Sequence, residues 1–178
     1  MAQGKEYGSA LFMLSREENT TDRVKEDIET VLAVLKENPE YVKLLDTPAL
    51  SKAERLRLID EAFANNICYS VLNVIKILSE RHCVYSLGEA VNAFTSLYNE
   101  FYQIEHVEAV TAVPMSSGQL KAMKEKLERL TGKTVVIKNT VSPEILGGVV
   151  LRYSGIQLDG SVKSKLDEFA AGLRNTTI

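Results

Sequence analysis

Residues 87–113 read LGEAVNAFTSLYNEFYQIEHVEAVTAV, and the spacing of the apolar residues changes within this stretch. As far as Phe101, apolar residues return every three or four positions, as they do on one face of an α-helix. These residues are Leu87, Ala90, Val91, Phe94, Leu97, Tyr98 and Phe101. The run from Val107 to Val113 is instead typical of a β-strand, and Pro114 ends it. We therefore expect a boundary near residue 106, between domains of residues 1–106 and 107–178.

Composition changes at the same place. Residues 1–106 contain three glycines and 11 basic against 17 acidic residues, which gives a net charge of −6. Residues 107–178 contain seven glycines and 10 basic against 7 acidic residues, which gives +3. The chain as a whole has 178 residues, is 45% apolar and 25% charged, and carries a net charge of −3. These values are typical of a soluble globular protein and argue against one that binds nucleic acid over its whole surface.

Helical spacing of apolar residues runs through the whole first domain. The expected helices include residues 7–14, 24–35, 41–45, 51–63, 71–78 and 87–101. Asp22 is the expected N-cap of the second helix, which should end before Pro39. Ser51, with Glu54 three residues later, has the pattern of a capping box. Six helices with short connections predict an all-α, antiparallel six-helix bundle.

Strands and helices are mixed in the second domain. Expected strands cover residues 107–113, 134–138, 146–153 and 156–158, with Gly147 and Gly148 inside the third of them. A helix should begin at Ser116 or Ser117 and end at Gly132. A final helix should use Val162, Leu166, Phe169 and Leu173. The order β-α-β-β-β-α predicts a small α+β domain with its helices on one face of a sheet.

No group of residues has the pattern of a catalytic or metal site. The two histidines, His82 and His106, lack a partner at ligand spacing, and Cys68 and Cys83 form no CxxC pair. The glycines of residues 147–160 match no phosphate-binding motif, so tight turns and close backbone packing explain them better. The basic residues of 121–133 alternate with glutamates, which favours a solvated face or a dock for an acidic helix over an RNA site. We expect no cofactor and no metal.

The sequence also lacks the features of a membrane span or of a signal peptide. No segment approaches the ~20 apolar residues of a membrane span. The apolar run of residues 8–14 is followed by Arg16-Glu17-Glu18, where a signal peptide would have small residues. We therefore expect a mature N-terminus, a cytoplasmic location and no direct insertion into a membrane.

Several stretches together resemble one family. They are Tyr7-Gly8-Ser9-Ala10-Leu11, Leu45-Asp46-Thr47-Pro48-Ala49-Leu50-Ser51, residues 73–80, Leu146-Gly147-Gly148-Val149-Val150-Leu151-Arg152 and Asp159-Gly160-Ser161-Val162 followed by Leu166. In order and spacing they are similar to the delta subunit of the bacterial ATP synthase, whose mitochondrial counterpart is the oligomycin-sensitivity-conferring protein. Departures include Gly8 in place of the usual alanine, and His82-Cys83-Val84 where Gly-Arg-Leu is common.

The resemblance implies a non-catalytic subunit of the stator. In this family the helical domain binds the N-terminal helix of an alpha subunit of the catalytic head, in a groove between its first and fifth helices. The second domain holds the b subunits of the peripheral stalk. The head is thereby kept from turning with the rotor, so that torque drives ATP synthesis. The resemblance further implies a peripheral protein on the cytoplasmic side of the bacterial plasma membrane, and a monomer when isolated.

The resemblance also directs attention to particular residues. Helical spacing in the first and fifth helices offers apolar contacts for a partner helix, and the candidates are Tyr7, Ala10, Leu11, Leu14, Val74, Ile77 and Arg81. Each of the apolar ones could equally be a core residue, because a helix that is apolar all round fits both cases. The C-terminal signature, which we expect to be structural, consists of Gly147, Gly148, Asp159, Gly160 and Ser161. Asp159 or Ser161 should cap the final helix.

Two other functions remain open from the residues alone. One is a helical RNA-binding or transcription-type module with an α+β appendage, although the net charge of −6 on residues 1–106 argues against contacts with phosphates. The other is a small enzyme with a regulatory helical half, for which no catalytic residues stand out.

Overall fold

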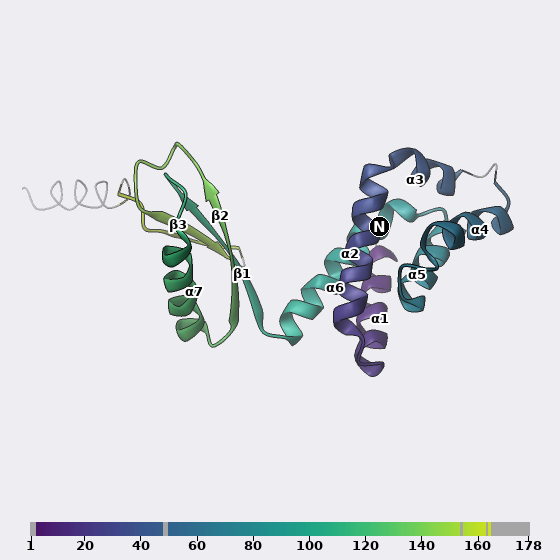
Figure 1. Ribbon diagram of the computed structural model, residues 1–178, viewed down its shortest axis with the longest axis horizontal. Coiled ribbons are helices and arrows are strands. Elements are labelled where there is room, and N and C mark those ends of the chain that lie inside the picture. Colours follow the sequence, from purple (N-terminus) through teal and green to yellow (C-terminus); the bar gives the residue numbers. More distant parts are fainter. Residues whose placement is uncertain (1–2, 48–49, 154, 163, 165–178) are drawn as a thin grey trace, which may run out of the picture. The chain divides into compact units, whose positions relative to one another are not determined.

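The computed structural model describes residues 3–47, 50–153, 155–162 and 164. The chain divides into two compact units, residues 1–101 and 102–178 (Figure 1). The first is helical and the second combines a sheet with a helix, which confirms the expected order of a helical part followed by an α+β part.

The helices of the first unit are α1 (Gln3–Glu17), α2 (Thr21–Glu37), α3 (Pro39–Asp46), α4 (Lys52–Phe63), α5 (Tyr69–Glu80) and α6 (Leu87–Phe101), with a 3₁₀ turn at Val84–Ser86. As expected, α2 ends before Pro39, and this proline then opens α3. Ser51 and Glu54 form the expected capping box at the start of α4. The expectation for Asp22 was wrong. The residue before α2 is Thr20, and Asp22 lies in the first turn, where its carboxylate accepts a hydrogen bond from the Tyr98 hydroxyl at 2.6 Å.

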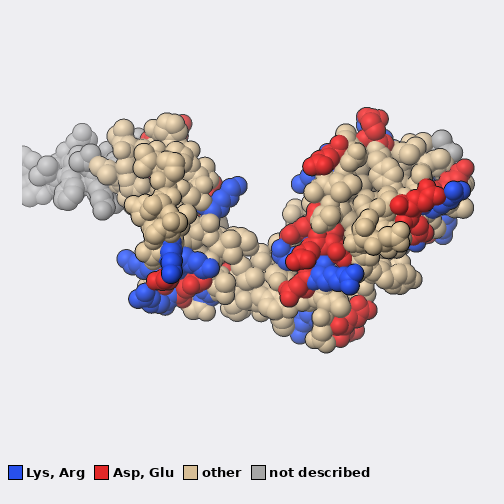
Figure 2. Space-filling model, viewed as in Figure 1, with Lys and Arg blue, Asp and Glu red and all other residues tan. Residues whose placement is uncertain are grey.

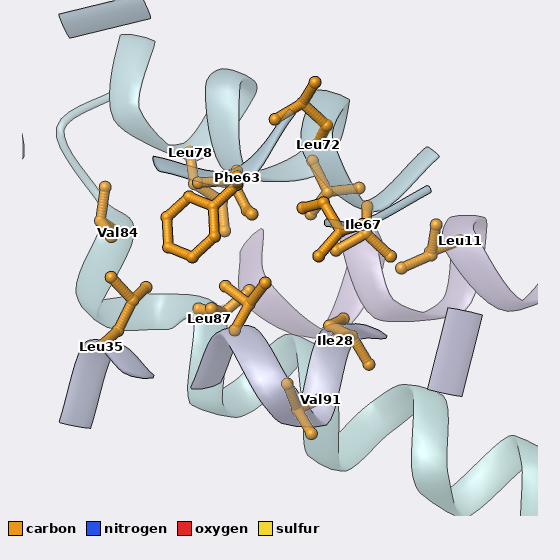
Figure 3. Close-up of a cluster of buried hydrophobic side chains, with 14 of the residues drawn as sticks. Leu11, Ile28, Leu35, Phe63, Ile67, Leu72, Leu78, Val84, Leu87 and Val91 are labelled. Carbon is orange, nitrogen blue, oxygen red and sulfur yellow. The ribbon is translucent and has the colours of Figure 1, made fainter. Parts of the chain in front are cut away.

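One apolar cluster fills the helical unit (Figure 3). Ile28, Ile75, Leu78 and Phe94 are fully buried within it, and they come from three different helices. The helices α1 and α6 pack with their backbones unusually close together. A Cβ atom at Gly8 would lie 2.2 Å from the carbonyl oxygen of Ala90, so only glycine fits there. This contact gives a physical reason for glycine at a position where the resembling family usually has alanine.

The elements of the second unit are β1 (Ile104–Thr111), α7 (Ser117–Thr131), β2 (Thr134–Val141), β3 (Val149–Tyr153) and β4 (Ile156–Asp159). The strands form one sheet in the order β2-β1-β3-β4. β1 runs parallel to β2, with α7 as the crossover between them, and β3 is antiparallel to both β1 and β4. Ser116 and Gln119 form a capping box at the start of α7, and Gly132 ends this helix with a φ of 68°.

Two expectations for this unit are wrong, and a third concerns residues that the structure does not describe. β1 begins at Ile104, where pairing with Thr134 of β2 starts, so the expected boundary at residue 106 lies inside a strand. Gly147 and Gly148 precede β3 rather than lying within it, because Gly148 has a φ of 88° that a strand does not allow. The final helix expected from Leu166, Phe169 and Leu173 lies outside the described residues.

The two faces of the sheet differ. Val107, Ala109 and Val135 share one face and are buried. The helix α7 packs beside this part of the sheet, where the Glu128 carboxylate accepts a hydrogen bond from the backbone N–H of Val135 at 3.1 Å. Side chains alternate along a strand, so the neighbouring residues point to the opposite face. That face carries exposed polar residues, including His106 and Lys138.

Candidate partner-binding surfaces

One hydrogen bond fixes how α1 and α5 face each other. The Ser70 hydroxyl, at the start of α5, donates to the Glu18 carboxylate just beyond the end of α1, at 3.4 Å. Residues three or four positions apart share one side of a helix. Val74, Ile77 and Arg81 therefore lie on the same side of α5 as Ser70, which is the side next to α1.

The same argument applies to α1. Counting back from Glu18 in helical steps reaches Leu14, Leu11, Ala10 and Tyr7, so these residues lie toward one side of α1. The candidates on each helix thus share one side of that helix, and α1 and α5 are in contact with each other. We use "α1–α5 surface" for Tyr7, Ala10, Leu11, Leu14, Val74, Ile77 and Arg81.

The residues of the α1–α5 surface differ in burial. Leu11 is 2% exposed and Val74 is 8% exposed, and both belong to the apolar core; Figure 3 shows Leu11 within it. For these two residues the core alternative holds, because neighbouring helices enclose their side chains. Tyr7 is half-buried against the core. Ala10, Leu14, Ile77 and Arg81 are exposed, with Leu14 at 42% and Ile77 at 39%.

Sequence reasoning missed one large exposed apolar side chain of α1. Met13 is 63% exposed and adjoins Leu14. It lies off the stripe with helical spacing that identified α1, so periodicity could not select it. An exposed methionine adapts its shape readily to a partner.

Charged residues lie at the ends of the two helices that carry these apolar residues. Arg81 lies at the C-terminal end of α5, and Glu17 and Glu18 lie at the end of α1. Acidic side chains are prominent on the face of this unit that Figure 2 shows. The arrangement can bury apolar side chains against a partner and orient that partner by charge, but it contains no nucleophile and no acid–base pair.

The C-terminal signature comes together at the corner where β3 begins and β4 ends. A Cβ atom at Gly148 would lie 2.5 Å from the carbonyl oxygen of Gly160. The N–H of Gly160 donates to the carbonyl of Val149 at 3.0 Å, and the N–H of Val162 donates to the carbonyl of Gly147 at 2.9 Å. Close backbone contact, rather than exposed chemistry, therefore accounts for the glycine at 148, whereas a Cβ atom at Gly147 would meet only the side chain of Val162, at 3.3 Å.

Side-chain hydrogen bonds complete this corner. The Ser161 hydroxyl accepts from the backbone N–H of Ser164 at 3.2 Å, as an N-cap residue does. The Asp159 carboxylate accepts from the N–H of Ser161 at 2.8 Å and from the Ser164 hydroxyl at 2.7 Å. Ser161, Asp159 and Ser164 are thus joined by hydrogen bonds, while the helix that Asp159 or Ser161 was expected to cap lies outside the described residues.

The reactive side chains show no catalytic arrangement. Burial raises the pKa of the Cys68 and Cys83 thiols, so both favour the unreactive protonated form. His82 is exposed, and its ring lies 3.1 Å from the carbonyl oxygen of Asp46 and 3.3 Å from the guanidinium of Arg55. Within the part of the chain that the structure describes, no three His, Cys, Asp or Glu residues are grouped as metal ligands would be.

Comparison with known proteins agrees with these features. The family model described as "ATP synthase delta (OSCP) subunit" matches residues 4–173. The chain belongs to the ATP synthase delta (OSCP) family. The subunit delta of Clostridioides difficile is 33% identical over 91% of this chain and 90% of its own length, and that of Carboxydothermus hydrogenoformans is 34% identical over 93% of each. A chain of the Toxoplasma gondii mitochondrial ATP synthase hexamer shares the fold, with a TM-score of 0.70 and 22% identity over 97% of this chain and 98% of that chain.

Membership in the delta (OSCP) family establishes the general role. The chain is a structural, non-catalytic subunit of an ATP synthase and acts in the stator, at the peripheral stalk. The alternatives of an RNA-binding module and a small enzyme are therefore set aside. No helix among the described residues is long and apolar enough to cross a membrane.

Proposed function

We propose that the helical unit acts as a six-helix bundle that binds the N-terminal helix of an alpha subunit on the α1–α5 surface. The observation that supports this most directly is the exposure of Leu14 and Ile77 on two helices that face each other. A partner helix that presents apolar residues at i, i+3, i+4 and i+7 can cover both at once.

The remaining residues of the α1–α5 surface have distinct roles in this complex. Ala10 is exposed and small, so a partner backbone can approach α1 closely there. Leu11 and Val74 support the surface from below, because they are buried in the core. Arg81 can form an ion pair with an acidic residue of the partner at one end of the contact. Burial of the apolar area contributes about 25 cal/mol per Å² before the costs of association are subtracted.

We further propose that residues 102–178 bind the b subunits of the peripheral stalk. In this arrangement one unit holds the catalytic head and the other holds the stalk, so the head is kept from turning with the rotor. The subunit would then lie on the cytoplasmic side of the bacterial plasma membrane, and the isolated chain would be a monomer. The separate compactness of the two units supports a division of labour of this kind.

The alpha-subunit contact can be tested by calorimetric titration of the full chain with a synthetic peptide of the alpha N-terminal helix. We expect saturable one-to-one binding with a negative heat-capacity change, which marks burial of apolar surface. Leu14→Asp should weaken binding at least about tenfold, because a carboxylate would be buried without a partner. Leu44→Asp is the matched control, since Leu44 on α3 is also 42% exposed.

The possible results distinguish a wrong position of the binding site from a wrong choice of partner. Equal binding by both variants would remove α1 from the contact while leaving the alpha subunit as the partner. Equal loss in both variants would indicate unfolding, which circular dichroism of each variant detects. No binding by the unaltered chain would contradict the proposal for the helical unit as a whole.

A further inference from the structure

The face of the sheet opposite α7 carries an ordered row of polar side chains. The strand registers place Lys138, Glu108, Arg152 and Gln157 next to one another across β2, β1, β3 and β4. His106 and Val136 are paired one step further along β1 and β2 on the same face. This open face is therefore defined by residues from all four strands.

Within the row, the single carboxylate already has partners. Glu108 lies 3.6 Å from the Arg152 guanidinium and accepts a hydrogen bond from the Thr140 hydroxyl at 2.8 Å. Arg152 also donates to the side chain of Gln157 at 3.2 Å, which fixes its direction. Lys138 is exposed and forms no ion pair with any residue that the structure describes. The open face thus presents cationic groups that can still form an ion pair with an anion.

The same face is hollowed, with a volume of about 470 Å³. The residues that line the hollow include the charged or polar His106, Glu108, Lys138 and Arg152 and the apolar Val136 and Ile156. Val136 is 45% exposed and Ile156 is 50% exposed. A hollow of this kind can accept an apolar side chain while the cations beside it pair with a carboxylate.

We propose that this open face binds an acidic amphipathic helix, with an apolar side chain in the hollow and a carboxylate directed at Lys138 and Arg152. The inference rests on the proposed function, in which this unit binds the stalk. It specifies that the open face makes the contact and that the bound part of the stalk is an acidic helix. Residues 102–178 contain 10 basic and 8 acidic residues, and the resulting net charge of +2 favours an acidic partner.

The basic helix α7 is a weaker candidate for the same partner. Lys124 is paired with Glu128, and Arg129 is paired with Glu125, so half of its local charge is already neutralised. No residue of α7 is fully buried, and none of its residues lines the hollow.

The test is calorimetric titration of the full chain with the soluble part of the b subunit from the same complex. Lys138→Glu should weaken binding about tenfold, because it places like charges opposite each other. Lys138→Gln should weaken it less, and added salt should weaken binding to the unaltered chain. Lys126→Glu is the control, because it makes the same charge change at an exposed position of α7.

Each outcome decides a different point. Tight binding by both Lys138 variants would overturn the assignment to the open face and leave the stalk role standing. Loss only with Lys126→Glu would assign the contact to α7 instead. Absence of binding by the unaltered chain would contradict the proposed stalk role, and this inference with it. Thermal unfolding of every variant checks that the fold is retained, and the milder Lys138→Gln keeps the test valid if the charge reversal unfolds the chain.

Discussion

Gly148 combines two constraints that can be separated by experiment. Its φ of 88° is unfavourable for any residue with a side chain, and a Cβ atom would lie 2.5 Å from the carbonyl oxygen of Gly160. Gly155 shares the first constraint, with a φ of 79°, but no heavy atom lies within 4 Å of its Cβ position. The two glycines therefore form a matched pair, one with a steric contact and one without.

We expect Gly155→Ala to cost about 1–2 kcal/mol, the usual penalty for a left-handed residue with a side chain. Gly148→Ala should cost about 3 kcal/mol or more, because the clash with Gly160 adds to that penalty. Replacing both Gly147 and Gly148 by valine should unfold residues 102–178. Urea unfolding of the full chain measures each change. Equal costs for the two alanine variants would show that the contact with Gly160 contributes nothing.

At the scale of the element, α4 and α7 both begin with a capping box, but one box contains a glutamate and the other a glutamine. Ser51 and Glu54 form the capping box of α4, whereas Ser116 and Gln119 form that of α7. Hydrogen bonds from the Ser51 side chain and backbone lower the pKa of Glu54. Gln119 has no charge to lose, so only the box of α4 should respond to pH.

The sign of this response follows from the direction of the shift. A carboxylate whose pKa is lowered by folding stabilises the fold above its unfolded value, about 4.3, and this contribution is lost as the pH falls through the folded pKa. We expect α4 to become less stable on acidification over that range and the Glu54→Gln variant to lose this dependence. Amide hydrogen exchange of α4 at several pH values measures it, with α7 as the internal control. A pH response of α4 that persists in Glu54→Gln would assign the effect to another carboxylate.

Local signals predicted element ends well where one residue determines the geometry. Pro39, Ser51, Ser116 and Gly132 each mark the expected boundary, because a missing N–H, a cap hydrogen bond or a left-handed φ acts within one turn. The start of β1 was missed because pairing with β2, thirty residues away, determines it. The position of Gly148 before β3 depends on contact with Gly160, which apolar spacing does not encode.

At the scale of the whole molecule, the candidate surface was predictable in outline but not residue by residue. Periodicity selected the sides of α1 and α5 that face each other. It could not distinguish Leu11 and Val74, which the core encloses, from Leu14 and Ile77, which remain exposed. That distinction depends on how closely the other helices approach, and this is a property of tertiary packing. Met13 was missed for a related reason, since an exposed apolar residue outside the stripe looks like any surface position in sequence.

The division into two units gives a prediction for the whole chain. A ligand that binds only the folded form stabilises it by RT ln(1 + [L]/Kd), which is about 2.7 kcal/mol at a hundredfold excess over Kd. If the alpha-subunit helix binds the α1–α5 surface, its peptide should slow amide exchange throughout residues 3–47 and 50–101 by about a hundredfold where exchange requires unfolding of that unit. Exchange in β1, β2 and β3 should not change, because those strands belong to the other unit.

The b-subunit fragment should produce the opposite pattern, with slower exchange in these strands and no change in the helical unit. Leu14→Asp at the same peptide concentration is the control, and its protection should be smaller by the factor by which this substitution weakens binding, about tenfold. Protection of both units by either ligand alone would mean that they unfold as one body, which would contradict the independence on which this division of labour depends.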